Sequence, residues 1–440
     1  MSDVRMRNAD LDSALAEARE SYVARNPKSL ARFVEATAVM PGGNTRTVLF
    51  YAPFPLGFAR GEGALLEDLD GRTYIDFLGE FTAGIYGHSH PVIRRAIEAA
   101  LDGGINLGGH NLLEARFARA VTTRFGLERA RFTNSGTEAN LMALATAVAA
   151  TRRRKVLVFR GGYHGAVFTF AAGGSPINVP HEFLVGRYND APAASALIAG
   201  HAPDLAAVVV EPMQGGGGCI PAEPDFLAAL RAAASNAGAV LIFDEVMTSR
   251  LAPHGLAAAL GIRPDLTTLG KYIGGGMSFG AFGGRAALLD LFDPRRPDAL
   301  PHAGTFNNNV LTMAAGLAGL TEVYTAAAAE ALSARGEALR ARLNALCRRA
   351  AAPLQFTGIG SMMTAHFTAD PIRSPEDVAG TDPRLKEIFF FDLLAAGIWI
   401  ARRGMINLSL PIGDSECDRL TAVVEEFLET RRPLLAASAL

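Results

Sequence analysis

Lys271 is the residue whose setting points most directly to chemistry. It follows the apolar run LTTLG and precedes three consecutive glycines, 274–276, which let the backbone pass close to a bulky ligand. A lysine that forms a Schiff base must be neutral when it attacks, so it needs burial or cationic neighbours to lower its pKa. A surface lysine is the ordinary alternative, but these flanks make a poor surface context. A phosphate-binding P-loop is excluded, because Tyr272, rather than Ser or Thr, follows Lys271.

Asp244 and Glu245 directly follow another apolar run, AVLIF at 239–243. A carboxylate at the end of a buried strand is costly unless it has a partner. A protonated pyridine nitrogen is one such partner, and the ion pair would keep the ring cationic, as an electron sink for carbanion chemistry requires. The alternatives are a metal-binding or a helix-capping aspartate. No histidine or second carboxylate at ligand spacing supports a metal, so none is expected.

Two glycine-containing motifs add candidate ligand contacts. In NSGTEAN (134–140), Ser135, Gly136 and Thr137 open a predicted helix, whose free N–H groups and small hydroxyls can hold a phosphate. A plain serine cap with glutamate at the third helical position fits the same residues. In GGYHG (161–165), Tyr163 follows an apolar run, so its ring can stack on a flat ligand, or can be a structural tyrosine in a turn.

The elements that must position these residues predict an α/β fold. Apolar runs at 155–159, 206–210 and 239–243 alternate with alanine-rich helical stretches, a pattern typical of a mostly parallel sheet covered on both faces. A glycine-rich segment, 279–284, is predicted as a further strand. All four candidate features fall at strand ends, where open α/β sheets bind their ligands.

The ends of the chain have a different character. Residues 11–40 read as short amphipathic helices broken at Asn26-Pro27, and 57–78 as a β-hairpin that turns at Asp70-Gly71. Helices are expected at 91–101, 112–125, 309–325, 327–350 and 415–430, and further strands near 354–358, 361–368 and 405–410. The last of these segments predict a smaller α+β unit.

Composition narrows the class of protein. The chain has 440 residues and a net charge of −2, which gives no electrostatic footprint for nucleic acid or an anionic membrane, so a small-molecule substrate is expected. Three widely spaced cysteines form neither a disulfide framework nor a metal cluster, and suit a reducing cytosol. No signal peptide and no run of 18 apolar residues is evident, so a cytoplasmic protein without a membrane span is predicted.

Taken together, the motifs resemble the fold-type I enzymes that use pyridoxal 5′-phosphate (PLP), and among them the class III aminotransferases. The resemblance covers nearly the whole chain. It implies an N-terminal segment at 1–85, a large PLP-binding domain at 86–325 and a C-terminal segment at 326–440 that forms a small α+β domain with the first. The matching segments are YGHSHP (86–91), NSGTEAN (134–140), GGYHG (161–165), EPMQG (211–215), FDEVMTS (243–249), LGKYIGGG (269–276) and GTFNNN (304–309).

The resemblance assigns roles residue by residue. Lys271 corresponds to the lysine that holds PLP as a Schiff base and moves the proton, and Asp244 to the partner of the pyridinium. Thr305 resembles a residue that completes the phosphate site of the neighbouring subunit, which implies a homodimer with a shared active site. The other implied cofactor contacts are Ser135, Gly136 and Thr137 at the phosphate, Tyr163 on one ring face, Val246 and Met247 on the other, and Gln214 near the ring hydroxyl.

Within the family, two subgroups are similar. FDEVMTS and the glycines after Lys271 look like the glutamate-1-semialdehyde aminomutases, but the segment 42–56 is similar to bacterial aromatic β-amino-acid (β-phenylalanine) transaminases. In that subgroup's chemistry Arg46 would clamp a carboxylate in bidentate fashion. Arg403 would bind the carboxylate of the acceptor, with the adjacent Arg402 as the alternative.

The resulting hypothesis is a ping-pong transamination from a β-amino-acid donor to an α-keto acid such as 2-oxoglutarate or pyruvate. Three alternatives stay open: the aminomutase reaction, a PLP-dependent decarboxylase, and a non-catalytic descendant that serves as a binding protein.

Overall fold

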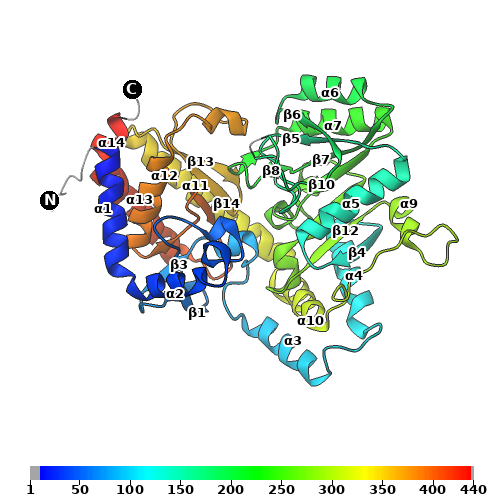
Figure 1. Cartoon of the computed structure of the whole chain (residues 1–440), viewed down its shortest axis with the longest axis horizontal. Helices are drawn as coiled ribbons and strands as arrows, with labels where there is room; N and C mark the ends of the chain where they lie inside the picture. The colour runs from blue at the N-terminus through cyan, green and yellow to red at the C-terminus, as the bar shows by residue number, and fades with distance from the viewer. Residues whose placement is uncertain (1–9, 172, 438–440) are drawn as a thin grey trace.

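The structure is a computed structural model that describes residues 10–171 and 173–437. A seven-stranded sheet forms the centre of the right-hand half of the molecule in Figure 1. Its neighbouring strands are parallel except for β12, which is antiparallel to both of its neighbours. The predicted mostly parallel sheet is therefore confirmed, and β6 is a strand that the sequence did not predict. In spatial order the strands are β4 (Arg129–Thr133), β12 (Gly280–Gly284), β11 (Leu266–Gly270), β10 (Val240–Asp244), β7 (Leu205–Val210), β5 (Lys155–Phe159) and β6 (Glu182–Gly186).

Helices cover both faces of this sheet because its central strands are apolar on both sides. Leu241 and Phe243 of β10 pack towards α6 (Ala191–Gly200) and α7 (Pro224–Ala237), whereas Val240 and Ile242 pack towards α5 (Gly136–Thr151). Figure 1 shows α6 and α7 along the top of the sheet and α5 on its other side. Alternation along the strand thus builds two separate cores.

The N- and C-terminal segments share a second sheet. Its strands are β1 (Phe58–Glu62), β2 (Leu65–Asp68), β3 (Thr73–Asp76) and β15 (Ile398–Trp399), and β15 pairs in parallel with β3. The predicted turn at Asp70-Gly71 joins β2 to β3, but the segment contains three strands rather than one hairpin, because β1 pairs with β2. A three-stranded antiparallel sheet of β13 (Gln355–Ile359), β14 (Met362–His366) and β16 (Met405–Asn407) lies nearby.

The remaining helices surround these sheets. The predicted helix at 309–325 is α-helical only from Val310 to Ala318. The next residues, Gly319–Val323, form a π-helical turn. Within the described ranges no single helix is long and apolar enough to cross a membrane. The segments Val310–Val323 and Ala326–Arg349 reach that length and apolar character only when taken together, and they meet at an angle of 74°. The bounds of the remaining helices are α1 (Leu11–Arg25), α2 (Pro27–Thr37), α3 (Pro91–Asp102), α4 (Leu112–Phe125), α8 (Leu256–Ala259), α9 (Ala286–Leu289), α10 (Val310–Ala318), α11 (Ala326–Arg349), α12 (Pro383–Ala395), α13 (Asp414–Thr430) and α14 (Arg432–Ala437).

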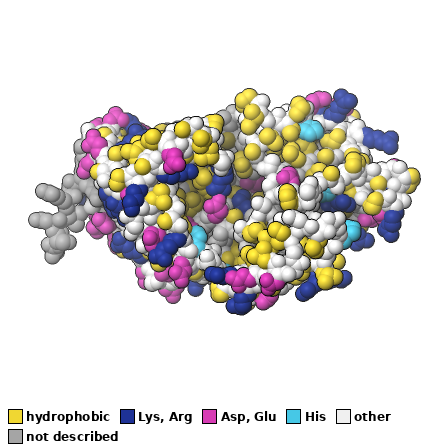
Figure 2. Space-filling model, turned by 60° about the horizontal axis from the view of Figure 1, so that its bottom comes forward, with side chains coloured by type: hydrophobic (Ala, Val, Ile, Leu, Met, Phe, Trp, Pro, Cys, Tyr) yellow, Lys and Arg dark blue, Asp and Glu magenta, His cyan; other side chains and the backbone are white. Residues whose placement is uncertain are grey.

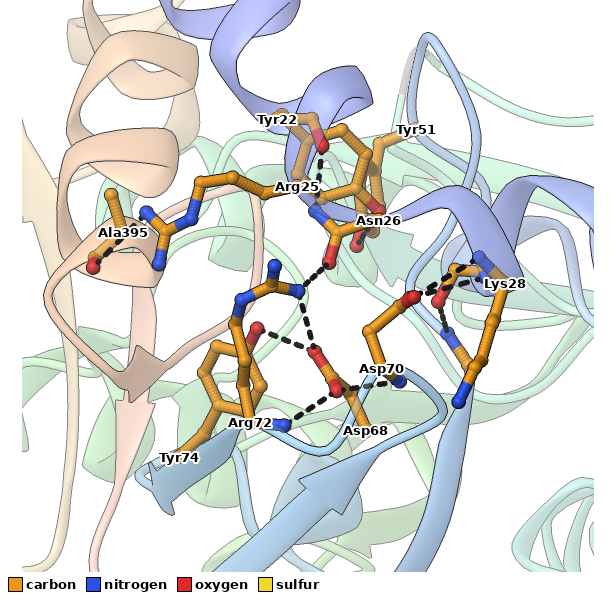
Figure 3. Close-up of polar contacts among 12 residues, drawn as sticks. Tyr22, Arg25, Asn26, Lys28, Tyr51, Asp68, Asp70, Arg72, Tyr74 and Ala395 are labelled. Carbon is orange, nitrogen blue, oxygen red and sulfur yellow. Dashed lines mark hydrogen bonds and ion pairs between the residues drawn. The ribbon is translucent and has the colours of Figure 1, made fainter.

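A buried carboxylate ties the break between α1 and α2 to the β2–β3 turn (Figure 3). Asp68 accepts hydrogen bonds from the backbone N–H groups of Asp70 (2.9 Å) and Arg72 (2.8 Å) and from the hydroxyl of Tyr74 (2.8 Å). The guanidinium of Arg72 in turn donates to the side-chain oxygen of Asn26 (3.2 Å). The conformation of this turn therefore depends on Asp68, and Asp70 adds a second link by accepting from the N–H groups of Lys28 (3.1 Å) and Ser29 (3.4 Å) at the start of α2.

Replacing this carboxylate should destabilise the protein strongly. Asp68→Ala leaves two N–H groups and a hydroxyl without their acceptor in a buried site, so we expect the free energy of unfolding to fall by about 3 kcal/mol. The free energy of unfolding is measured by urea titration, with circular dichroism as the signal. Asp298→Ala, which removes an exposed partner of Arg296, is the matched control. An equal, small effect of both substitutions would contradict the role of Asp68.

Candidate active site

Four of the predicted site residues meet at one edge of the large sheet. Asp244 is the last residue of β10, and Lys271 follows the last residue of β11. Ser135 follows β4, and Tyr163 follows β5. These four strands run in the same direction, so their carboxyl ends bring residues from distant parts of the chain to a common edge.

Asp244 finds its partners within the chain. Its Oδ2 atom accepts hydrogen bonds from Nδ2 of Asn140 (2.9 Å) and from Nδ1 of His164 (2.8 Å), and its Oδ1 atom accepts from the N–H of Val246 (3.0 Å). Burial alone lowers the pKa of His164, but the hydrogen bond and the charge of Asp244 outweigh it, so the pKa is raised above its usual value. The Asp244 carboxylate is therefore surrounded by hydrogen-bond donors in a water-poor site.

The neighbouring carboxylate of Glu245 has a different task. It accepts hydrogen bonds from the N–H groups of Leu256 (2.7 Å) and Ala257 (3.2 Å) at the start of α8. Burial raises the pKa of Glu245 to about 7. Of the two adjacent acids, Asp244 faces the site and Glu245 caps a helix. No group of three or more metal-ligating side chains occurs in the described part of the chain.

Lys271 lies in a left-handed backbone conformation, with φ of 55°, directly after β11. Burial lowers the pKa of its amine to about 8, Asp244 and Glu211 oppose this shift, and Arg403 and Arg46 add to it. At pH 8 about half of the amines are thus neutral, far more than for a lysine in water. This is the state that a nucleophile or a proton acceptor needs.

The start of α5 combines a helix cap with room for an anion. Oγ of Ser135 accepts a hydrogen bond from the N–H of Glu138 (3.1 Å), so the capping alternative is realised here. The amides of Gly136 and Thr137 lie in the first turn, where no intrahelical carbonyl is available. A Cβ atom on Gly136 would lie 2.8 Å from Cγ1 of Val246, which explains the glycine. The first turn can therefore hold a phosphate.

A buried acid that the sequence did not single out, Glu211, joins two loops at the site. Its carboxylate accepts hydrogen bonds from the N–H groups of Tyr163 (3.1 Å) and Gly215 (3.2 Å). Tyr163 keeps 46% of its surface exposed. Gln214 donates from Nε2 to the carbonyl of Arg160 (2.8 Å), whereas its buried Oε1 atom has no donor among the described residues. That oxygen is free to accept a hydrogen bond from a hydroxyl group of a ligand.

These features fit the cofactor that the resemblance implies. The first turn of α5 offers amides for a phosphate, Oε1 of Gln214 offers an acceptor for a ring hydroxyl, and Asp244 offers a buried carboxyl group for a protonated ring nitrogen. Val246 and Met247 are buried beside this space, and the ring of Tyr163 remains open.

The two candidate substrate arginines meet at one aromatic ring. Cζ of Arg46 lies 5.9 Å, and Cζ of Arg403 5.3 Å, from the ring centroid of Phe81. Arg402 instead points to Glu387, with Nη1 and Oε1 2.8 Å apart. The structure thus places Arg403, and not its neighbour, next to Phe81.

Phe81 belongs to a strained turn, Gly79–Thr82. Its φ angles are 53°, 48°, 52° and 80° in chain order, so three successive non-glycine residues are left-handed. This conformation costs roughly 1–2 kcal/mol per residue, and such strain persists at sites where surrounding contacts enforce it. The sequence carries no signal for this turn, and Glu80 and Phe81 were not predicted as site residues.

Thr305 lies apart from this cluster, in an exposed loop. The loop contacts the start of the phosphate motif, because Oδ1 of Asn307 accepts a hydrogen bond from Nδ2 of Asn134 (3.1 Å). Within the described chain no hydrogen bond or ion pair joins the Thr305 side chain to the residues around Lys271.

Comparison with known proteins gives a consistent result. The Aminotransferase class-III family profile matches residues 50–428. A β-phenylalanine transaminase of Variovorax paradoxus is 59% identical over 98% of this chain and 99% of its own, and the crystal structure of that organism's β-phenylalanine aminotransferase superposes with a TM-score of 0.96 over 97% and 99% of the two chains. A glutamate-1-semialdehyde 2,1-aminomutase of Sorangium cellulosum is 39% identical over 85% of this chain and 90% of its own.

The lowered pKa of Lys271 can be measured by competitive labelling. In ligand-free protein, acetylation of Lys271 by trace acetic anhydride should rise with pH and level off above about 8, because the amine is then neutral. In the urea-unfolded chain the rise should continue to about pH 10.4, the ordinary value for lysine. Mass spectrometry of the Lys271 peptide reads both curves. Coincident curves would show that the fold does not perturb this amine.

Proposed function

The chain belongs to the class III aminotransferases, which depend on PLP, and from this premise we propose that it transfers the amino group of an aromatic β-amino acid to an α-keto acid such as 2-oxoglutarate or pyruvate. One observation carries the choice of donor: the similarity to a β-phenylalanine transaminase extends over nearly the whole chain at 59% identity. The two arginines at Phe81 give this similarity a physical basis.

Residues of this chain would hold the cofactor at three points. The amides of Gly136 and Thr137, with the hydroxyl of Ser135, would bind its phosphate at the positive end of α5. Asp244, whose carboxylate is hydrogen-bonded to His164, would pair with its protonated ring nitrogen. When bound, the cationic ring accepts electron density from the carbon that loses its proton. Tyr163 and Val246 would bracket the ring.

Lys271 is the proposed proton carrier. Its amine is neutral in a large fraction of molecules near pH 8, so it can take the proton from the amine-bearing carbon and return it at a neighbouring atom. Burial of the site limits the access of water to this amine. The charges of Asp244 and Glu211 keep the pKa from falling further, so the lysine can also release the proton.

Two arginines allow two kinds of substrate. A β-amino acid carries its carboxylate one carbon farther from the amine than an α-amino acid does, so one site must accept two geometries in alternating half-reactions. A guanidinium binds a carboxylate in a planar, bidentate manner. We propose that Arg46 and Arg403 serve as these two carboxylate sites, since both lie within 6 Å of the Phe81 ring centroid.

We further propose a homodimer in which Thr305 completes the partner's phosphate site. Thr305 and the exposed Phe306 lie in a loop tied to the α3–α4 connection, because Nδ2 of Asn111 donates to the carbonyl of Asn308 (2.9 Å). That connection exposes Leu107, and Leu112, the first residue of α4, is 90% exposed. Figure 2, which turns the lower edge of Figure 1 forward, shows hydrophobic side chains gathered on the right half of this face. A second copy would cover them.

The reaction class is tested with a panel of donors. β-Phenylalanine with 2-oxoglutarate or pyruvate should give amino transfer and a change in the visible absorbance of the bound cofactor, and Lys271→Ala should abolish both. Lys155→Ala, which removes a half-buried lysine paired with the exposed Asp204, is the control and should stay active. Isomerisation of glutamate 1-semialdehyde without transfer from β-phenylalanine would identify an aminomutase instead.

The shared site is tested by mixing two inactive variants. Lys271→Ala and Thr305→Asp should each be inactive, the second because a carboxylate repels the phosphate. If Thr305 acts on the partner's site, hybrid dimers contain one intact site, so an equal mixture that has exchanged subunits should recover about one quarter of wild-type activity. No recovery, although mass spectrometry detects hybrid dimers, would place Thr305 outside the partner's site.

A further inference from the structure

The left-handed turn Gly79–Thr82 presents two successive side chains to the candidate carboxylate sites. Oε1 of Glu80 lies 2.7 Å from Nη1 of Arg46. The next residue, Phe81, has its ring within cation–π distance of Arg46 and of Arg403. One turn therefore contacts both arginines, whereas neither Glu80 nor Phe81 belongs to the motifs of the cofactor site.

We propose that this turn positions the two carboxylate sites: Phe81 fixes the separation of the two guanidinium groups, and Glu80 holds Arg46 in position until a substrate carboxylate takes its place. This inference rests on the proposed function, because it assumes that Arg46 and Arg403 bind substrate carboxylates. It adds two residues that position those arginines.

Phe81 is suited to set a distance because its ring contacts both cations. A guanidinium is planar and weakly hydrated, so it stacks on an aromatic face without losing its hydrogen-bonding edge. Cζ of Arg403 and Cζ of Arg46 lie 5.3 Å and 5.9 Å from the same ring centroid. A change in this ring must therefore affect both carboxylate sites together, although one arginine precedes the large domain and the other follows it in the chain.

Glu80 is suited to an exchangeable contact. The side chains of Arg46 and Glu80 are 45% and 57% exposed to solvent. Ion pairs exposed to this degree contribute little stability, so a substrate carboxylate can replace Glu80 at small cost. While the pair exists, Arg46 is held near Phe81 instead of sampling solvent. The negative charge of Glu80 also opposes an incoming carboxylate, which limits binding.

The turn keeps its conformation because both of its ends are fixed. Oδ1 of Asp76 accepts hydrogen bonds from the N–H groups of Leu78 and Gly79 (2.9 Å each). At the other end the fully buried Arg250 donates to the carbonyl of Thr82 (3.2 Å) and also to that of Leu408. Helical or extended backbone would point residues 80 and 81 elsewhere, so these contacts decide where the ring lies.

The role of Phe81 is tested by binding rather than turnover. Dissociation constants of 3-phenylpropanoate, an aromatic acid with the donor's carboxylate spacing, and of glutarate are measured by calorimetry on the PLP-loaded enzyme. Phe81→Leu should weaken both by roughly three- to thirty-fold, because the cation–π contacts are lost, and Phe81→Tyr should retain both. Phe292→Leu, which removes the ring 5.4 Å from Cζ of Arg131 outside the site, should change neither. Weakening of one ligand alone, or of neither, would overturn this role.

Glu80→Gln should have the opposite effect. Removing the competing charge should tighten both acids by roughly two- to five-fold, as expected for a partly exposed pair. Glu98→Gln, which neutralises the exposed partner of Arg94 at 2.7 Å on α3, is the matched control and should leave both constants unchanged. Unchanged or weaker binding in Glu80→Gln would overturn the proposed competition.

The two proposals fail in distinguishable ways. If the wild-type enzyme does not transfer the amino group of β-phenylalanine, the proposed function is wrong, whatever the variants bind. If it does so, and the Phe81 and Glu80 variants bind both acids like the wild type, only the role of the turn is wrong.

Discussion

A carboxylate at the end of a fully buried strand must be compensated by nearby donors, and Asp244 draws them from separate elements. Asn140 reaches it from α5, and His164 from the loop after β5. Thr268 of β11 donates to Oδ1 of Asn140 (2.7 Å), so the strand that precedes Lys271 joins the same network. The segment 134–140, the loop that carries Tyr163 and the strand that precedes Lys271 are therefore held in fixed relation by the requirement to satisfy one buried carboxyl group.

The charges around Lys271 act in opposite directions. Asp244 and Glu211 favour its ammonium form, Arg403 and Arg46 disfavour it, and burial decides the outcome, a pKa of about 8. The same arginines that are proposed to bind substrate thus also help to keep the amine neutral. A lysine whose pKa is lowered by burial and by nearby cationic groups is typical of a reaction centre.

Sequence patterns predicted what depends on burial and on local motifs. The runs at 155–159, 206–210 and 239–243 are strands because both of their faces are covered, and Lys271 and Asp244 do lie at one sheet edge. The short strand β6, EFLVG, has too little pattern to be recognised. The turn at Glu80 and Phe81 could not be predicted, because three of its four left-handed residues are not glycines and contacts from distant segments enforce it. Individual residue roles, the domain boundaries and the cytoplasmic location remain predictions.

The parallel pairing of β3 with β15 has a consequence for biosynthesis. Ile75 and Asp76, made early, pair with Ile398 and Trp399, made near the end, and Asn407 clamps the carbonyl of Leu78 through its side chain (2.9 Å). Contacts between such distant segments close only after the intervening chain has been ordered. The large sheet can fold while the ribosome is still translating, but the turn that carries Phe81 cannot be locked until the last segments emerge. Translation thus supplies the residues of this chain that are proposed to hold the cofactor before it can fix the turn at the proposed carboxylate sites.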